Sequence, residues 1–246
     1  MKFKDKVAIV TGGANGIGYA IALNLAKEGA NIIIADIDVA GGKKAIEKIK
    51  SLKRKAISIK MDVTSREDIK RMVKATLDEF GAIDILINNA GGGARKARTA
   101  FANEADEMTD MIIARNLKST LCCTREVINH MIDRRSGKIV NIASVCGING
   151  VPQEATFSAA KAGIIIFTKA LAMEVGSYGI NVNCVSPGGI DTLLTTKSRA
   201  KPQETVKFRM GKPEDVAGIV TYLASDEASF VNGQNYAVTG VVSMFG

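Results

Sequence analysis

The chain has 246 residues, of which 46% are hydrophobic and 24% are charged, and its formal net charge is +8. This length fits one large α/β domain, and the composition is ordinary for a soluble globular protein, which excludes disordered, collagen-like and disulfide-stapled chains. The longest apolar runs, such as residues 163–167, fall far short of the ~18 residues that a membrane span needs. Residues 1–5 lead directly into a strand-like run, which leaves no room for a signal peptide. We therefore expect a cytoplasmic protein that does not contact a membrane.

Cysteine and histidine content limits the chemistry. The four cysteines, Cys122, Cys123, Cys146 and Cys184, show neither CxxC nor metal-ligand spacing. A Ser-His-Asp triad, like most zinc sites, would have to use the single histidine, His130. His130 lies near the end of a predicted amphipathic helix and suits a surface or capping role. We therefore expect no metal site, and hydrolase and metalloenzyme functions are disfavoured.

Strand-like and helix-like segments alternate along the chain. Short apolar runs with little polar alternation predict strands buried on both faces, and longer amphipathic patterns predict helices between them. This alternation predicts one α/β domain over residues 1–246, a doubly wound parallel sheet with helices on both faces. The predicted strands are residues 7–10, 32–35, 56–61, 83–87, 138–142, 180–185 and 234–238, and the predicted helices are residues 17–28, 40–52, 66–80, 104–133, 156–175 and 213–224.

A glycine-rich segment, Thr-Gly-Gly-Ala-Asn-Gly-Ile-Gly at residues 11–18, follows the first predicted strand. In such sheets ligands bind at the carboxyl ends of the strands. Glycines 12, 16 and 18 permit a tight turn and close approach to a pyrophosphate, and the next helix offers its N-terminal N–H groups to the phosphates. Because the glycines lie between a strand and a helix, they predict a dinucleotide site.

The second predicted strand ends at Asp36. A carboxylate there can accept hydrogen bonds from both ribose hydroxyls of an adenosine, and it would repel a 2′-phosphate. The neighbouring positions hold Asn15 and Ile37 rather than a basic residue. The alternative is a simple loop carboxylate. Together with the glycine segment, Asp36 favours NAD(H) over NADP(H).

Further motifs resemble those of the short-chain dehydrogenase/reductase superfamily, in the right order over nearly the whole chain. Asn88-Asn89-Ala90-Gly91 matches the family signature after the fourth strand, and Pro187-Gly188 matches the segment after the sixth. The resemblance implies a Rossmann-type sheet of about seven strands, NAD as the cofactor, and a homotetramer. It implies that Asp62 and Val63 contact adenine and that Ile190 and Thr192 help to hold the nicotinamide carboxamide. The implied cofactor-binding residues are Gly12, Asn15, Gly16, Ile17, Gly18, Asp36, Asp62, Val63, Asn89, Ala90, Gly91, Lys161, Pro187, Gly188, Ile190 and Thr192.

The catalytic positions match the family with one exception. Asn116, Ser144 and Lys161 are present, but Phe157 stands where the family has its catalytic tyrosine. By resemblance, Ser144 polarises the substrate oxygen, Lys161 favours the phenolate and holds the nicotinamide ribose, and Asn116 supports a water. Phenylalanine keeps the ring and removes the proton. Ser158 points about 100° away around the helix and is a poor substitute.

Loss of a general acid–base group typically lowers a rate by ~10²–10⁴-fold. Phe157 is therefore either an engineered inactivation of an NAD-dependent alcohol dehydrogenase or ketone reductase, or a natural feature of a non-catalytic NAD-binding regulatory or interaction protein. A third possibility is another reaction in the same pocket, without hydride transfer. Activity restored by Phe157→Tyr would favour the first.

Two segments that should line the substrate mouth hold the excess positive charge. Residues 92–103 carry three basic residues and no acid, and residues 192–212, a mobile lid in the family, carry six basic residues and one acid. Their formal charges sum to +8, so the rest of the chain is balanced. This favours an anionic substrate, either a carboxylate, a phosphate, a sulfonate or a coenzyme A thioester. The alternative is a solvated basic surface.

Nucleic acid is a poorer partner for these loops, because Phe101 and Phe208 are their only aromatic residues. Helices 104–133 and 156–175 are expected to pack on symmetry mates, and the apolar residues 241–246 to be buried at a subunit contact. Cys146 is expected to line the pocket rather than act as a redox thiol. The substrate-binding residues suggested by these considerations are Ser144, Cys146, Gln153, Phe157, Gly189, Arg95 and Arg199.

Overall fold

The computed structural model describes residues 1–92, 99–192 and 209–240. Its centre is a seven-stranded sheet in the order β3-β2-β1-β4-β5-β6-β7, in which every neighbouring pair is parallel. The predicted doubly wound α/β fold is therefore confirmed. The strands are β1 (Val7–Thr11), β2 (Asn31–Asp36), β3 (Ala56–Lys60), β4 (Ile85–Asn88), β5 (Gly137–Ile142), β6 (Ile180–Pro187) and β7 (Asn235–Val238).

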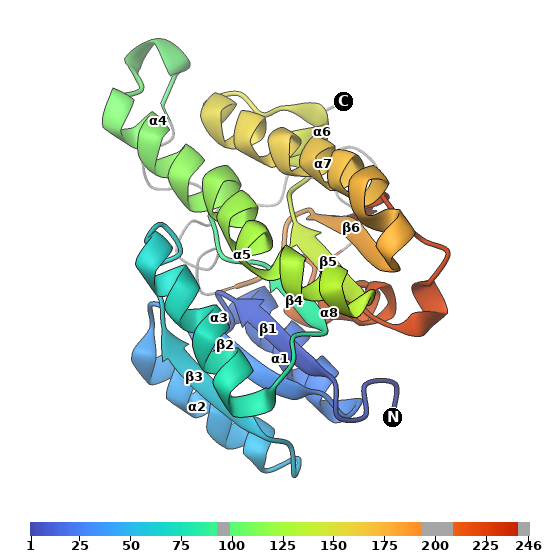
Figure 1. Cartoon of the computed structure of the whole chain (residues 1–246). Helices are drawn as coiled ribbons and strands as arrows, with labels where there is room; N and C mark the ends of the chain where they lie inside the picture. Colours follow the sequence, from blue (N-terminus) through green and yellow to red (C-terminus); the bar gives the residue numbers. More distant parts are fainter. Residues whose placement is uncertain (93–98, 193–208, 241–246) are drawn as a thin grey trace.

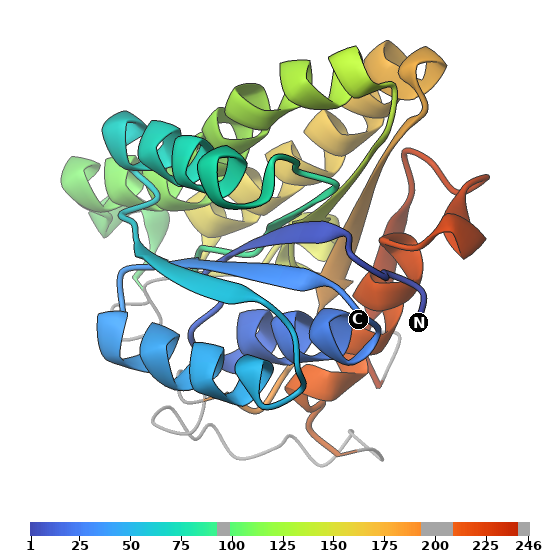
Figure 2. The same ribbon diagram turned by 60° about the horizontal axis from the view of Figure 1, so that its bottom comes forward.

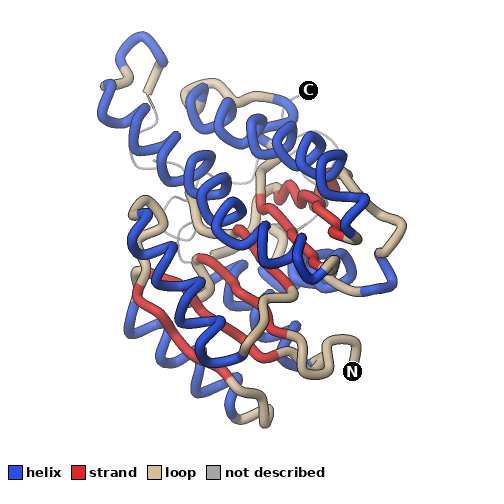
Figure 3. Tube along the Cα trace, viewed as in Figure 1, coloured by secondary structure: helices blue, strands red, loops and turns tan. Residues whose placement is uncertain are grey.

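Helices cover both faces of the sheet, so the molecule has three layers (Figures 1 and 2). One face carries α1 (Gly16–Lys27), α2 (Val39–Lys50) and α8 (Pro213–Leu223). The other carries α3 (Arg66–Phe80), α5 (Ser119–Arg134) and α7 (Ala155–Val175). Figure 3 shows the strands enclosed between these helices. The inner strands therefore bury both faces, as their apolar runs predict, whereas the edge strands β3 and β7 are partly exposed.

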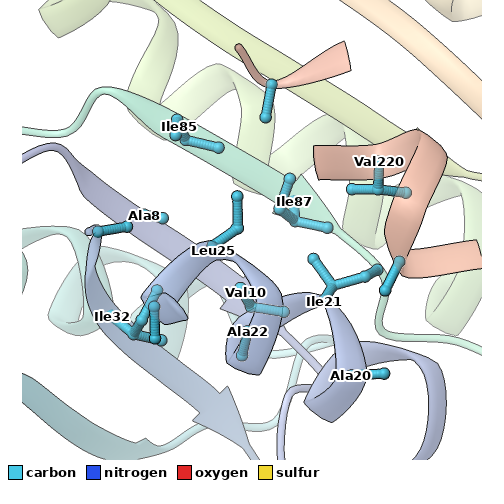
Figure 4. Packing of buried hydrophobic residues seen from close by; sticks show 14 of the residues in the cluster. Ala8, Val10, Ala20, Ile21, Ala22, Leu25, Ile32, Ile85, Ile87 and Val220 are labelled. Atoms are coloured by element: carbon cyan, nitrogen blue, oxygen red, sulfur yellow. The ribbon is translucent and has the colours of Figure 1, made fainter. Parts of the chain in front are cut away.

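Alternate residues of one strand supply the two halves of the core. On β1, Ala8 and Val10 face α1, where they meet Leu25, and Val7 and Ile9 face the opposite helices. Figure 4 shows the α1 side, where side chains from neighbouring strands surround those of α1 and α8. This two-sided burial fixes the register of the strands, and with it the positions of the loops at their carboxyl ends.

The long helix predicted over residues 104–133 is not regular, and that prediction was wrong in this respect. α4 (Asp106–Ile113) and α5 are joined by a π-helical turn, η3 (Ala114–Lys118), which contains Asn116. The Asn116 side-chain Nδ2 donates to the Ile112 carbonyl at 2.9 Å, so the side chain forms a hydrogen bond with a backbone acceptor of the preceding helical turn. Single π turns of this kind recur at functional sites.

Several short elements escape sequence patterns because they are only three or four residues long. They are α6 (Cys146–Asn149) and the 3-10 turns η2 (Phe101–Asn103), η4 (Gly176–Tyr178) and η5 (Asp226–Ala228). His130 lies near the end of α5, and its Nε2 accepts a hydrogen bond from the Ile83 N–H at 3.2 Å. Within the described residues, no three His, Cys, Asp or Glu side chains form a group that could hold a metal.

The segment Ala155–Tyr178 is long and apolar enough to cross a membrane by length and composition. Half of it is buried, and core helices of globular proteins meet the same criterion. Its buried residues, such as Ile164 and Leu171, pack towards the sheet, while Ile166 is 62% and Met173 81% exposed. We therefore describe α7 as a core helix with an apolar outer face.

Candidate active site

The loops after β1 and β4 meet where the strand order reverses, which is the position of the ligand crevice in doubly wound sheets. They are tied together by side chains. Thr11 Oγ1 accepts hydrogen bonds from the Asn89 and Ala90 N–H groups, each at 3.0 Å. Asn89 Nδ2 donates in return to the carbonyls of Thr11 (3.0 Å) and Gly12 (2.9 Å). Two predicted cofactor segments thus form one rigid floor.

The glycines of this floor leave room that side chains would fill. Gly12 has φ +63°, and a Cβ on it would lie 2.9 Å from the Ala90 Cα. A Cβ on Gly18 would overlap the carbonyl oxygen of Gly12. Gly16 opens towards Thr192, whose Cγ2 would be 3.5 Å from an added Cβ. These close approaches fit a cradle for a dinucleotide pyrophosphate.

The first turn of α1 is suited to an anion. Within the described structure, Asn15 is the N-cap residue but makes no side-chain hydrogen bond to that turn, which also carries no acidic residue. The free N–H groups and the positive end of the helix dipole face the cradle. Ile17 follows the cap within the same turn. The residues present therefore fit the dinucleotide that the glycine pattern predicts.

Asp36 at the end of β2 is held by backbone groups. Its Oδ2 accepts from the Ala14 N–H and its Oδ1 from the Asp38 N–H, both at 2.9 Å. Asp38 in turn accepts from Asn15 Nδ2 at 2.8 Å and from the Gly41 N–H at 2.9 Å. The Gly41 hydrogen bond, followed by that from Asn15, lowers the pKa of Asp38. Two carboxylates therefore stand at the predicted ribose end of the crevice.

The segment after β3 forms the third wall of the cofactor side. Asp62 Oδ1 accepts from the Thr64 N–H (2.9 Å) and hydroxyl (2.7 Å). Val63 and Thr64 line a cavity of about 280 Å³ that also reaches Lys118 and Cys122 on the helix that bears Asn116. Ser144 and Phe157 do not line this cavity. It therefore adjoins the predicted adenine end and not the reaction centre.

Three predicted functional residues converge behind the β4 loop. Asn116 Oδ1 accepts from the Gly92 N–H at 3.0 Å, and its Nδ2 donates to the Gly92 carbonyl at 3.1 Å. A Cβ on Gly91 would lie 2.6 Å from Asn116 Oδ1 and 3.4 Å from Lys161 Nζ. Gly91 therefore lets the asparagine and the lysine approach the same point.

Lys161 is only 5% exposed, and its Nζ donates to the Ile142 carbonyl at 2.9 Å. Burial lowers the pKa of Lys161 from 10.5 to about 8. The Nζ lies 5.7 Å from the centroid of the Phe157 ring, a cation–π distance. Residue 157 is thus one helical turn from the lysine, on the side that a tyrosine would occupy, but it offers no proton.

The substrate side is formed by the end of β5 and the start of α7. Ser144 Oγ accepts from the Cys146 N–H at 3.2 Å. Cys146 Sγ in turn donates to Glu154 Oε2 at 3.6 Å. Gln153 is exposed and has φ +64°, a left-handed conformation that few residues of its type adopt. A chain of two contacts therefore links the Ser144 hydroxyl to the Glu154 carboxylate through Cys146.

The segment after β6 borders the cradle, because Thr192 faces Gly16. The Gly188 N–H donates to the Val238 carbonyl at 3.0 Å, which fixes the turn after Pro187. Gly211 pairs with Ile190, and its N–H donates to the Gly189 carbonyl at 2.9 Å. The two ends of the predicted lid therefore lie side by side, joined by backbone contacts between Gly211 and residues 189–190.

The basic mouth is described only in part. Arg95 and Arg199, predicted to contact an anion, lie outside the described residues, as does most of the predicted lid. Arg209 is described, and its guanidinium binds both carboxylate oxygens of Asp215, at 2.7 and 2.8 Å. The prediction that Arg209 adds to the unpaired positive charge of the mouth was wrong. Its partner Asp215 lies just beyond residues 192–212, the segment whose charges the prediction summed.

Three residues of this region were missed by sequence analysis. Glu104 Oε1 accepts from the Thr109 hydroxyl at 2.7 Å and from the Thr156 hydroxyl, so it joins the start of α4 to the start of α7. Thr11 and Glu154 were likewise not singled out. Glu154 lies only three residues before Phe157, so its position in the sequence could have marked it as a candidate. Glu104 could not be found in this way, because its contact joins residues 52 positions apart.

Comparison with known proteins gives consistent results. Residues 6–203 match the family model of short chain dehydrogenases. The chain is 39% identical to (2S)-[(R)-hydroxy(phenyl)methyl]succinyl-CoA dehydrogenase subunit BbsD of Thauera aromatica, over 100% of its own length and 99% of that protein. It is 40% identical to 3-oxoacyl-[acyl-carrier-protein] reductase FabG of Thermotoga maritima, over 98% of each chain.

Solved structures agree at the level of the whole fold. The structure of NAD+-bound xylitol dehydrogenase superposes with a TM-score of 0.91 at 29% identity, covering 98% of this chain and 100% of that one. Levodione reductase gives a TM-score of 0.91 at 29% identity, covering 97% of each chain.

Proposed function

The chain belongs to the short-chain dehydrogenase family, and we propose that it is an NAD(H)-dependent oxidoreductase that interconverts a secondary alcohol and a ketone. The observation that carries this proposal is the approach of Asn116 and Lys161 to one point at Gly91, with Lys161 held by the Ile142 carbonyl two residues before Ser144. A nicotinamide dinucleotide, when bound, supplies the hydride acceptor or donor. The protein supplies orientation, a polarising hydroxyl and a path for the proton.

We assign the cofactor to the glycine floor, Asp36, Val63, and the segment from Pro187 to Thr192. The Lys161 ammonium holds the ribose hydroxyls and Ser144 donates to the substrate oxygen. Asn116, locked to Gly92, holds the solvent connection behind the lysine. The two carboxylates at the ribose end disfavour an added 2′-phosphate, so NAD(H) is preferred over NADP(H).

For the substrate we propose an anionic compound, and among the classes considered an acyl thioester of coenzyme A or of acyl carrier protein. Two relatives that match the whole chain bear names of this kind, a succinyl-CoA dehydrogenase subunit and a 3-oxoacyl-[acyl-carrier-protein] reductase. The excess of basic residues in segments 92–103 and 192–212 suits the phosphates of such a carrier.

Phe157 makes this enzyme slower than its tyrosine-bearing counterpart. The decisive experiment compares the chain with Phe157→Tyr on a panel of hydroxyacyl and 3-oxoacyl thioesters, with NAD+ or NADH. We expect the variant to gain about 10²-fold in kcat/KM, within the range of a general acid–base group. Tight NADH binding by both proteins, followed by fluorescence, completes the test. If Phe157→Tyr turns over none of the panel although it binds NADH, the proposal is wrong.

A second candidate is a non-catalytic subunit that binds NAD and supports an active partner of the same fold. Phe157 favours it, as does the name of the Thauera aromatica relative, which is a subunit. The exposed apolar residues Ile166 and Met173 on α7 would meet such a partner. For the chain alone we propose a homotetramer built through α5 and α7. The molecular mass measured by light scattering distinguishes a homotetramer from a monomer that requires a different subunit as its partner.

A further inference from the structure

The substrate side of the site contains a carboxylate, Glu154, that the family pattern does not use for the proposed chemistry. Glu154 is the N-cap residue of α7, three residues before Phe157 and seven before Lys161. Positions with this spacing share one face of a helix. Glu154 itself lies just before the first helical residue, so its carboxylate stands at the end of α7 that carries Phe157 and Lys161.

One contact shows where this carboxylate points. Its Oε2 accepts from Cys146 Sγ at 3.6 Å, and the Cys146 N–H donates to Ser144 Oγ at 3.2 Å. Glu154 and the Ser144 hydroxyl are therefore both anchored on the same residue. Cys146 therefore links the carboxylate to the hydroxyl that we assign to the substrate oxygen, and Glu154 and Cys146 are both half-buried.

The other ionisable groups around Phe157 are committed elsewhere. Lys161 Nζ donates to the Ile142 carbonyl and lies behind the ring. Glu104 accepts from two threonine hydroxyls that join α4 to α7. Of these three groups, Glu154 is the one that contacts Cys146, which in turn contacts Ser144.

We infer that the Glu154 carboxyl group exchanges the proton with the substrate oxygen, in place of the phenol that position 157 lacks. This inference rests on the proposed function. In the oxidation direction the Glu154 carboxylate takes the hydroxyl proton of the alcohol while the adjacent C–H bond breaks and its hydride reduces NAD+. The new carboxylic acid then releases the proton to solvent. In the reduction direction the acid protonates the ketone oxygen as NADH delivers the hydride.

Kinetics of four variants test this assignment. Glu154→Gln keeps the shape of the side chain and removes its exchangeable proton, so we expect kcat/KM of the chain to fall at least about tenfold. Glu174→Gln, an exposed carboxylate on the same helix, is the matched control and should leave kcat/KM unchanged. In the Phe157→Tyr background the phenol takes over, so adding Glu154→Gln should change kcat/KM less than about threefold.

A spectroscopic measurement tests contact without turnover. The infrared difference between the chain and Glu154→Gln isolates the carboxyl bands of Glu154. A secondary alcohol of the thioester class, added without any cofactor, should shift these bands, and the Glu174 bands should not move. NADH fluorescence should give the same affinity for the chain and Glu154→Gln, because Glu154 lies outside the cradle.

These experiments distinguish a failure of the Glu154 inference from a failure of the proposed function. If Glu154→Gln retains the rate of the chain, or its bands ignore the alcohol, the inference is overturned and the proposed function stands. The same holds if the chain is inactive while Phe157→Tyr turns over. If Phe157→Tyr is inactive as well, the proposed function fails and the inference fails with it.

Discussion

The predicted cofactor side and the predicted substrate side of the candidate site are built from different kinds of contact. Around β1, β2 and β4 the backbone itself sets the geometry, because Gly12 and Gly18 leave no space for a side chain and Asp36 is held by N–H groups. Around β5 and α7, side chains set it, through Ser144, Cys146 and their neighbours. A change on the first side alters the path of the chain. A change on the second side alters the chemistry and leaves the fold intact.

Phe157 illustrates this difference. Its ring keeps the packing over Lys161, and only the hydroxyl of the family tyrosine is absent. Such a substitution requires no backbone adjustment. Chemistry on the substrate side can therefore be lost, or moved to a nearby group, without a cost in stability. The predictions below test this contrast from the largest expected effect to the smallest.

The largest effect is expected at Gly18. A Cβ there overlaps the Gly12 carbonyl oxygen, and the backbone must shift to accept it. Gly18→Ala should weaken NADH binding at least about 100-fold and lower the free energy of unfolding by about 1–3 kcal/mol. Fluorescence titration and denaturant unfolding measure both. The control is Gly218→Ala on exposed α8, where nothing lies within 4 Å. An unchanged NADH affinity in Gly18→Ala would contradict the backbone argument.

Lys161 should make stability depend on pH. Its pKa falls from 10.5 to about 8 on folding, so between these values the unfolded chain binds more protons than the folded chain. Burial of the charged Lys161 therefore costs stability below pH 8, and the free energy of unfolding should rise by about 3 kcal/mol as pH increases through this window. Lys161→Met should flatten the rise between pH 8 and 10.5. Lys169→Met, an exposed lysine on the same helix, should preserve it.

Cofactor choice should change moderately at Asp36. We expect the chain to bind NADPH at least about tenfold more weakly than NADH, because a 2′-phosphate would meet a fixed carboxylate, a repulsion of about 1–4 kcal/mol. Asp36→Ala should narrow that ratio, as measured by fluorescence titration with both cofactors. Equal affinities for the two cofactors in the unaltered chain would refute the assignment.

The smallest effect is expected at Arg209. Its guanidinium is already bound to Asp215 through two hydrogen bonds, so Arg209→Ala should change kcat/KM for an anionic thioester less than about twofold, since exposed ion pairs contribute little. These variants are measured in the Phe157→Tyr background, because its higher expected kcat/KM makes small changes measurable. Arg199→Ala in the same background should lose more, and rising salt should reduce kcat/KM. Equal losses at both positions would show that Arg209 also serves the substrate.

Sequence patterns predicted the sheet and the glycine-rich turn well because their determinants are local. The central strands are short apolar runs, and Gly12, Gly16 and Gly18 lie within seven residues of one another. The substrate side was harder because its contacts join distant residues. The hydrogen bond of Glu104 to Thr156 spans 52 positions, and the pairing of Arg209 with Asp215 crosses a predicted boundary. The π turn at Asn116 was missed because the regular helix before it, α4, has only eight residues, too few to define a hydrophobic stripe against which a shift of one position would show.

That π turn has a consequence for how this family position can vary. One additional residue in a helix rotates everything beyond it by about 100° about the axis. Deleting a residue among Ala114–Lys118 would restore a regular helix, but it would turn either Asn116 away from Gly92 or the Cys123 face of α5 away from the sheet. Both faces cannot be kept with an uninterrupted helix. The irregularity therefore links the face that α5 packs against the sheet to the position of the Asn116 side chain, and we expect a single-residue deletion here to misplace one of the two.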